Sequence, residues 1–192
     1  MSEEEVILWR CGVEIITKRL ILRPIITDDV YDVFEYSKEP NVGPNAGWKP
    51  HESIEESLQV MQDIFINKEN VFGIVLKKTG KLIGSVGLID DKKRENDAVK
   101  MLGYAIGEKY WGQGYMTEAG KAVVLHGFKI INLALISAYC YSSNTRSQGV
   151  LNKLGFQYEG KLALCEKIYD GSVYDNECFA LWPEELNSLY LE

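Results

Sequence analysis

The sequence predicts a single α/β or α+β domain that is built around one mixed β-sheet. Its 192 residues are close to the length of one ordinary domain and are enough to bury a core without disulfides or metals. Hydrophobic residues make up 46% and charged residues 26% of the chain, a composition that excludes disorder as its main state. Segments with strand-like and helix-like spacing follow one another in the order β-α-α-β-β-β-α-β-α-β-β, which is typical of a mixed sheet covered by helices.

The first strand is expected at residues 19–23, after a lead, residues 1–16, for which the pattern predicts no element. Polar and apolar side chains alternate over 19–23, and the alternation stops at Pro24, as expected of a strand that ends there. Thr27 is a helix-capping residue type and precedes two aspartates, which are favourable in a first helical turn. We therefore expect a helix to begin at Thr27.

A second helix is expected after a loop at residues 40–50 that is rich in glycine, asparagine and proline. Ser53 and Glu56 have the spacing of a capping box, in which each side chain accepts the backbone N–H of the other residue. Apolar side chains then recur at helical intervals, at Ile54, Leu58, Met61 and Ile64. This helix should pack on the core through that face.

The remaining elements are apolar runs separated by turn signals. The expected ranges are 71–76, 81–88, 99–106 and 135–141 for strands, 117–130 and 144–154 for helices, and 162–169 and 174–181 for a closing hairpin. Gly155 directly after the second of these helices is a C-terminal capping glycine. Asp170-Gly171 between the last two strands is a tight hairpin signal.

The charge and the cysteine pattern exclude several classes of protein. The net charge of −7 argues against nucleic acid as the main ligand, whereas an acidic surface mildly attracts cationic partners such as amines. The four cysteines and two histidines do not cluster, so the sequence predicts no metal site. Residues 1–5 are acidic and no apolar run approaches roughly 18 residues, so neither a signal peptide nor a membrane segment is expected. We therefore expect a cytoplasmic protein with free thiols.

The segment from Gly107 to Ala119 carries the main functional signal. It places Gly112 and Gly114 between a strand and a helix, where backbone N–H groups can converge at the positive end of the helix dipole. Such a turn is a phosphate site that needs no lysine. The alternative is a tight connection that binds nothing. The P-loop pattern is absent and Thr117 replaces the third glycine of the dinucleotide fingerprint, so a nucleotide-phosphate enzyme is supported only by the glycine turn.

The residues of this turn resemble those of a known family. The run Trp111-Gly112-Gln113-Gly114-Tyr115 followed by Thr117-Glu118-Ala119 is similar to the acetyl-CoA signature of GCN5-related N-acetyltransferases (GNAT), in particular the RimJ/RimL-like ribosomal-protein N-terminal acetyltransferases. Three further segments also resemble this branch: Thr17 to Pro24, Asn144 to Phe156, and Glu159-Gly160 with Asp170-Gly171 and Asp175. The resemblance covers about residues 17–185. We accordingly assign 17–187 to the N-acetyltransferase domain, 1–16 to the lead and 188–192 to a tail.

The resemblance implies a mixed, mostly antiparallel sheet that splays between its fourth and fifth strands, flanked by helices. The pantetheine arm of acetyl-CoA is expected in the opening, with the residues that bind the cofactor being Tyr104, Ala105, Ile106, Gly112, Gln113, Gly114, Tyr115, Met116, Thr117 and Asn144. The pyrophosphate is expected on backbone N–H groups from Gly112 through Thr117. Met116 is bulkier than the glycine or alanine usual in the family, and Leu151 stands where many members have a tyrosine acid.

The resemblance also implies the catalytic residues. Ser147 lies one helical turn after Asn144 and is expected to protonate the departing thiolate. Glu166 is expected to deprotonate the amine, and Glu108 is the competing base. For all three the alternative is an exposed residue without a role. Tyr104, Tyr115 and Tyr141 are further candidates for an acid or for the pocket wall.

The expected function is transfer of the acetyl group of acetyl-CoA to a primary amine, either a protein N-terminus or a small molecule. The alternative is a non-catalytic module on the same fold that binds or senses acyl-CoA. Trp48 and the loop 40–50 lie where the family forms its acceptor wall. A homodimer is compatible with the sequence, since dimers are the commonest assembly of soluble oligomers.

Overall fold

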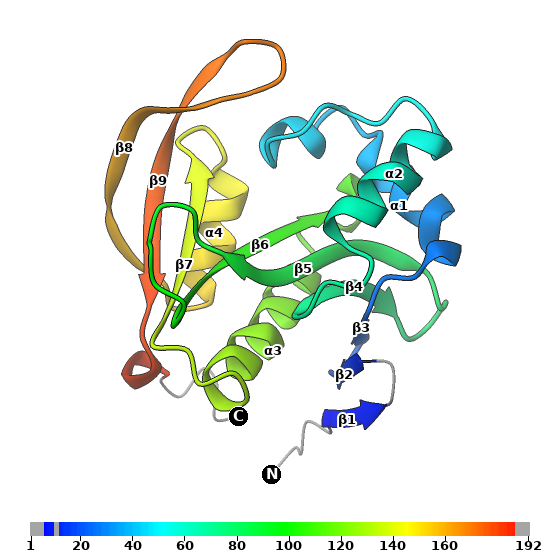
Figure 1. The fold of residues 1–192 in the computed structure, drawn as a ribbon, viewed down its shortest axis with the longest axis horizontal. Helices are drawn as coiled ribbons and strands as arrows, with labels where there is room; N and C mark the ends of the chain where they lie inside the picture. Colours follow the sequence, from blue (N-terminus) through cyan, green and yellow to red (C-terminus); the bar gives the residue numbers. More distant parts are fainter. Residues whose placement is uncertain (1–5, 10–11, 187–192) are drawn as a thin grey trace.

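The computed structural model describes residues 6–9 and 12–186, and this part of the chain forms one nine-stranded sheet with helices on both faces (Figure 1). The strands are β1 Val6–Trp9, β2 Gly12–Ile16, β3 Leu20–Arg23, β4 Val71–Leu76, β5 Leu82–Asp90, β6 Val99–Ile106, β7 Leu135–Tyr141, β8 Gln157–Lys167 and β9 Val173–Leu181. The α-helices are α1 Val30–Ser37, α2 Ile54–Ile64, α3 Tyr115–Lys129 and α4 Thr145–Lys153.

The strand order is β1-β2-β3-β4-β5-β6-β7-β9-β8, and every neighbouring pair is antiparallel except β6 and β7, which are parallel. The parallel pair arises because the chain crosses from β6 to β7 through α3. The expected mixed, mostly antiparallel sheet is therefore confirmed. Strands β1 and β2 lie within the lead, residues 1–16, where the residue pattern predicts no element.

Two apolar cores hold the helices on opposite faces of the sheet. The larger core joins α3 and α4 to the sheet, and fully buried Ile83 and Val123 lie in it. The smaller core joins α1 and α2 to the other face through Val33, Met61 and Leu82. Each helix buries its apolar face against the sheet. The helices therefore cover the middle strands on both sides.

Local sequence signals account for where several helices begin and end. The Ser53 side chain accepts the backbone N–H of Glu56 at 3.1 Å and starts α2, as the capping box predicts. The Glu56 carboxylate, however, accepts the N–H of Glu52 rather than that of Ser53. Gly155 follows α4 with φ of +83°, the left-handed conformation of a C-terminal capping glycine. These ends match the helices expected from the sequence.

The first helix begins later than expected. A 3₁₀ turn over Thr27–Asp29 precedes α1, which starts at Val30. The Asp29 carboxylate accepts two hydrogen bonds of 2.7 Å from the Arg23 guanidinium and one of 2.9 Å from the Ile26 N–H. This bidentate pair draws Asp29 toward β3 and fixes the tighter turn ahead of the helix.

The expected strand ranges 71–76, 99–106 and 135–141 coincide with β4, β6 and β7. On α2, Met61 is fully buried, but Ile64 at the end of the expected apolar face is 48% exposed. Within the described residues, no helix is both long enough and apolar enough to cross a membrane.

Close packing of β5 against β6 predicts that Gly84→Ala destabilises the fold. A Cβ at Gly84 would overlap the carbonyl oxygen of Ala105 and lie 2.8 Å from the Cα of Ile106. We expect a loss of about 1–3 kcal/mol in the free energy of unfolding, measured by urea denaturation, because overpacked cores must shift backbone. Gly103→Ala is the matched control, since its Cβ would meet only Ile89 at 3.8 Å. Equal stability of the two variants would contradict this packing.

Candidate active site

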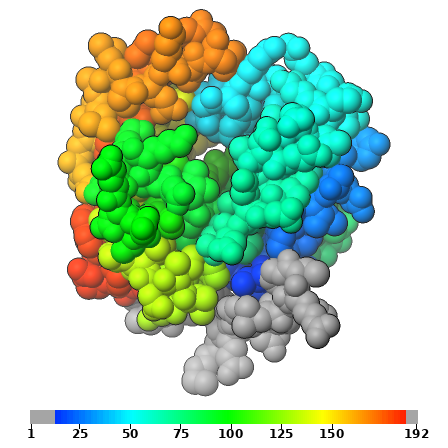
Figure 2. Space-filling view, in the orientation of Figure 1, coloured from blue at the N-terminus to red at the C-terminus, as the bar shows by residue number. Residues whose placement is uncertain are grey.

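The sheet opens between β6 and β7, and a cavity of about 1410 Å³ occupies this region. The last parallel pair joins Met101 to Ser137. Beyond it, Tyr104, Ala105 and Ile106 remain paired with β5, but in the described chain they have no partner on β7. The expected splay is thus present, and Figure 2 shows the hollow on the surface of the molecule. All three residues line the cavity.

The glycine turn borders this cavity and leads into α3. Gly112 and Gly114 have φ of +72° and +78°, a backbone conformation that residues other than glycine rarely adopt. The turn therefore directs the chain so that α3 begins at Tyr115, two residues earlier than the pattern predicts. The first N–H groups of a helix have no intrahelical acceptor, so those of Tyr115, Met116 and Thr117 are available to an anion. This donor set fits a diphosphate.

An ion-pair network that the sequence reasoning missed fixes the turn to β3. The Arg19 guanidinium contacts Glu118 at 2.6 Å and donates to the carbonyl oxygen of Gln113 at 2.9 Å. Glu118 also accepts the Thr17 hydroxyl and the backbone N–H of Arg19, both at 2.7 Å. Burial opposes ionisation of Glu118, but these hydrogen bonds outweigh it and lower the pKa of the carboxyl below its usual value. Arg19 also lies over the Tyr115 ring, at 4.3 Å from its centroid.

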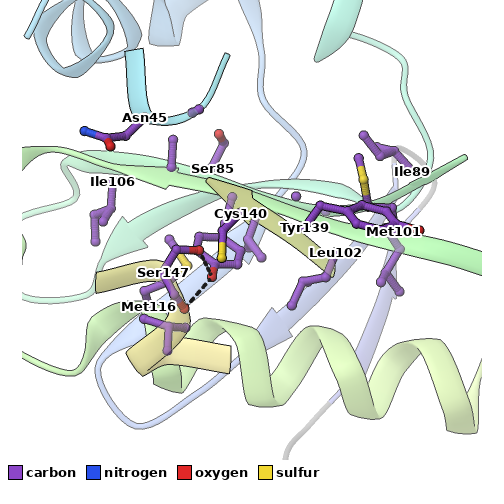
Figure 3. Close-up of a pocket in the computed structure, with 18 of the residues that line it drawn as sticks. Asn45, Ser85, Ile89, Met101, Leu102, Ile106, Met116, Tyr139, Cys140 and Ser147 are labelled. Atoms are coloured by element: carbon purple, nitrogen blue, oxygen red, sulfur yellow. Dashed lines mark hydrogen bonds between the residues drawn. The ribbon is translucent and has the colours of Figure 1, made fainter. Parts of the chain in front are cut away.

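The bulky residue of the turn, Met116, is accommodated by the core. Its side chain is only 6% exposed and packs in the larger core beneath the cavity. Met116 and Ser147 both line the cavity and are labelled in Figure 3. The Met116 side chain therefore leaves the surface of the turn free. Leu151, at the place of the missing tyrosine, is fully buried in the same core.

The side chains of Trp111 and Gln113 stabilise the turn by donating hydrogen bonds to backbone carbonyl oxygens. The Trp111 indole N–H donates to the oxygen of Ile106 at 2.8 Å, and the Gln113 amide donates to that of Lys109 at 2.7 Å. The Arg146 guanidinium lies 4.4 Å from the centre of the Trp111 ring. Arg146 thus brings a positive charge to the cavity wall beside the turn.

Ser147, on α4, lines the cavity and contacts β6, the strand that is expected to bind the cofactor. Its Oγ lies 2.7 Å from the hydroxyl oxygen of Tyr104. Figure 3 labels Ser147 and marks its hydrogen bonds with dashed lines. Asn144 is the N-cap of α4, and its Oδ1 accepts the Ser147 N–H at 3.1 Å. Burial raises the pKa of the Tyr104 phenol, and burial likewise raises that of the nearby Cys140 thiol to about 11. At neutral pH both groups are protonated, so Tyr104 can donate to Ser147.

Glu166 lines the opposite part of the cavity, on β8. Its Oε1 accepts the Tyr141 hydroxyl at 3.0 Å and its Oε2 accepts the Asn176 amide at 2.8 Å. Burial and this hydrogen bond to Glu166 raise the pKa of the Tyr141 phenol, which keeps it a donor. The competing base, Glu108, is outside the cavity lining of the described chain and accepts the backbone N–H of Asn41. The geometry therefore brings Glu166, not Glu108, to the site.

The loop 40–50 closes the cavity above Glu166. Trp48 lines the cavity, and the backbone carbonyl oxygen of Asn45 accepts a hydrogen bond from the Asn144 side-chain amide at 3.3 Å. A Cβ at Gly47 would lie 3.3 Å from both Glu166 Oε1 and the Tyr141 hydroxyl oxygen. The loop thus forms a wall of the site, as expected from the sequence. Across the described ranges no group of three acidic, histidine or cysteine side chains could hold a metal ion.

Comparison with known proteins shows the family. The family model "Acetyltransferase (GNAT) domain" matches residues 19–157. The chain is also 32% identical over 175 residues to "Uncharacterized N-acetyltransferase p20" of Bacillus licheniformis, with 88% of this chain and 96% of the relative covered. The chain therefore belongs to the GNAT family of acetyltransferases, an enzyme family that uses acetyl-CoA as its acetyl donor.

Two further similarities concern more specific relatives. The "Spermidine N(1)-acetyltransferase" of Escherichia coli K12 is 26% identical over 141 residues, which cover 73% of this chain and 74% of that enzyme. The structure of Mycobacterium smegmatis RimJ in complex with CoA-disulfide superposes with a TM-score of 0.73 at 20% identity and covers 94% of this chain and 88% of RimJ. This likeness confirms the fold expected from the sequence.

The network around the glycine turn predicts a specific effect of Arg19→Ala. The variant loses the contacts with Glu118 and Gln113, so we expect about 1–2 kcal/mol less stability in urea denaturation and roughly fivefold weaker CoA binding by calorimetry. Lys18→Ala is the control. The Lys18 side chain is exposed and adjacent to Arg19, and its removal should leave the turn unchanged. CoA affinity equal to that of the unmodified protein would show that Arg19 does not hold the turn.

Proposed function

We propose that this chain transfers the acetyl group of acetyl-CoA directly to a primary amine. The observation that carries the proposal is that one cavity is bordered by the glycine turn, by Ser147 and by Glu166. The turn fits a diphosphate, and the two side chains are an acid and a base of the types that acetyl transfer requires. The chain is acidic, with a net charge of −7. It can bind the anionic diphosphate because the contacts are local backbone N–H groups at the start of α3.

Residues along the opening between β6 and β7 are proposed to bind acetyl-CoA. Residues 104–106 have no strand partner on β7 in the described chain, so an extended amide-bearing chain can pair with this edge. The Ile106 oxygen is the exception, because it already accepts the Trp111 indole N–H. Asn144 lies at the start of α4 beside this edge. Backbone N–H groups from Gly112 through Thr117 are proposed to bind the diphosphate. Bound acetyl-CoA supplies the thioester whose carbonyl carbon the amine attacks.

Glu166 is proposed to accept a proton from the amine nitrogen. The carboxylate is fixed by donors on both oxygens, Tyr141 and Asn176, so its remaining lone pairs have a defined direction into the site. The neutral amine forms the new N–C bond with the thioester carbon while the C–S bond breaks, and Glu166 accepts the proton that the nitrogen then loses. The base returns its proton to water after the transfer.

Ser147 is proposed to give a proton to the departing sulfur. Tyr104 stays protonated, and its hydroxyl can donate either to the Ser147 carbonyl oxygen at 3.3 Å or to Ser147 Oγ at 2.7 Å. In the second arrangement the hydrogen of Ser147 can point into the cavity. Water restores the proton of Ser147 at the end of the cycle. The acceptor is a primary amine, either a small molecule or a protein N-terminus. Similarity to a spermidine acetyltransferase supports the former, and the RimJ-like fold supports the latter.

The proposal predicts that acetyl-CoA binds with micromolar affinity and is consumed in the presence of an amine. Calorimetry measures the binding, and thiol release measures turnover with spermidine and with the peptide Ser-Ala-Ala as acceptors. Acetyl-CoA binding without thiol release for any amine would favour the non-catalytic sensing module. ATP binding in preference to CoA would support a nucleotide-phosphate enzyme instead.

The assignment of acid and base predicts how kcat responds to substitution. Glu166→Gln should lower kcat about 10²-fold and Ser147→Ala roughly 10- to 100-fold, because each removes a proton-transfer group, while CoA affinity changes little. Glu108→Gln and Ser143→Ala are matched controls, since both side chains are outside the cavity lining of the described chain. Full activity of Glu166→Gln together with loss in Glu108→Gln would reverse the assignment of the base.

A further inference from the structure

The pairing of the last two strands is irregular just before the proposed base. On β8, Leu162 is opposite Asn176 of β9, and Glu166 is opposite Tyr174. Between these two pairs β8 advances by four residues while β9 advances by two. Two extra residues are therefore accommodated in a β-bulge, residues 163–165, which bends this strand of the hairpin.

The bulge decides where along the strand Glu166 lies. In a regular antiparallel ladder that continues from the preceding pair, Leu164 would be opposite Tyr174, and Glu166 would lie two positions farther toward the hairpin turn. At about 3.4 Å per residue, this is a displacement of roughly 7 Å. The carboxylate would then move away from Tyr141 and Asn176, which now donate to it at 3.0 Å and 2.8 Å. The bulge therefore brings Glu166 to its place in the cavity lining.

The backbone of the bulge is unfavourable by itself. Leu164 has φ of +50°, in the left-handed region that residues other than glycine rarely adopt. Its side chain is 74% exposed, so burial of apolar surface does not compensate for this conformation. Another contact must therefore stabilise the bulge against the regular ladder.

Asp175, on the neighbouring strand β9, supplies such a contact. Its Oδ1 accepts the backbone N–H of Leu164 at 2.7 Å, and its Oδ2 lies 2.6 Å from the Lys161 ammonium nitrogen. These two groups lower the pKa of the Asp175 carboxyl, and a charged acceptor makes a strong hydrogen bond to a backbone N–H. A regular ladder pairs backbone with backbone, so this hydrogen bond favours the bulged arrangement alone.

We propose that Asp175 is a positioning residue for Glu166: its carboxylate holds the bulge, and the bulge places the base where the amine nitrogen reacts. The inference rests on the proposed function, because Asp175 acts only through Glu166. Asp175 itself is outside the cavity lining of the described chain. It therefore affects proton transfer without contacting either substrate.

Two substitutions separate the backbone hydrogen bond from the ion pair. Asp175→Ala loses both and should lower kcat about tenfold, whereas CoA affinity measured by calorimetry should not change. Asp175→Asn keeps an oxygen acceptor for the Leu164 N–H and should lower kcat only about twofold, since an exposed ion pair contributes little. Asp170→Ala is the matched control, because this aspartate of the same hairpin accepts the Ser172 N–H at 2.8 Å but lies outside the bulge. Its kcat should stay unchanged.

Two double variants show whether Asp175 acts through the base. When Glu166→Gln has already removed the base, adding Asp175→Ala should lower kcat no further, because residues that act through one group are not additive. Adding Leu164→Gly to Asp175→Ala should recover most of the lost kcat, because glycine adopts a positive φ readily. General damage to the hairpin predicts a further loss in the first double variant and no recovery in the second.

The outcomes, measured as thiol release with spermidine and with Ser-Ala-Ala, separate this inference from the proposed function. Full activity of Asp175→Ala beside an impaired Glu166→Gln overturns the role of Asp175 and leaves the acetyltransferase proposal intact. A tenfold loss that persists in the Glu166→Gln background also overturns it, because the effect would not pass through the base. An unmodified chain that releases no thiol with either amine removes the proposed function and this inference together.

Discussion

The end of parallel pairing between β6 and β7 at Met101 and Ser137 is the constraint on which the site depends. A sheet normally satisfies the backbone groups of both neighbours along their whole length, and separation of two central strands leaves groups unpaired. Here residues 104–106 have strand partners on β5 alone, within the described chain. The opening is held by α4, whose Ser147 contacts Tyr104, and by the closing hairpin, which brings Glu166 to the cavity. The same separation therefore exposes a backbone edge and places Ser147 and Glu166, the proposed acid and base, at the cavity beside it.

Charged and polar groups in the site are supported by contacts between distant segments. Arg19 on the chain entering β3 holds Glu118 of α3 and the turn that precedes it. On the other side of the opening, Tyr141 and Asn176 direct both oxygens of Glu166. Such donors define the direction of a carboxylate and so restrict where a reacting nitrogen can lie. The glycine turn and the base are thereby fixed independently, by different parts of the sheet.

The sequence predicted those features that depend on neighbouring residues. Apolar runs between turn signals placed β4, β6 and β7, and the glycines marked the turn before α3, because both signals are local. Arg19 and Glu118 were missed as partners because 99 residues separate them, and a single sequence holds no signal for such a contact. For the same reason the resemblance named Glu166 as the base but left Glu108 as its competitor, and it did not indicate the contact between Asn176 and Glu166. Strands β1 and β2 went unpredicted because the lead has no clear turn or alternation signal.

The most direct test of the central claim is a crystal structure with a bisubstrate analogue, in which the CoA sulfur is joined through an acetyl group to the amine nitrogen of the acceptor. We expect the pantetheine chain along Tyr104 to Ile106 in the opening and the diphosphate at the start of α3. The sulfur should then lie beside Ser147 and the linked nitrogen beside Glu166. A ligand that lies outside the opening, or whose linked nitrogen is remote from Glu166, would contradict the proposed site.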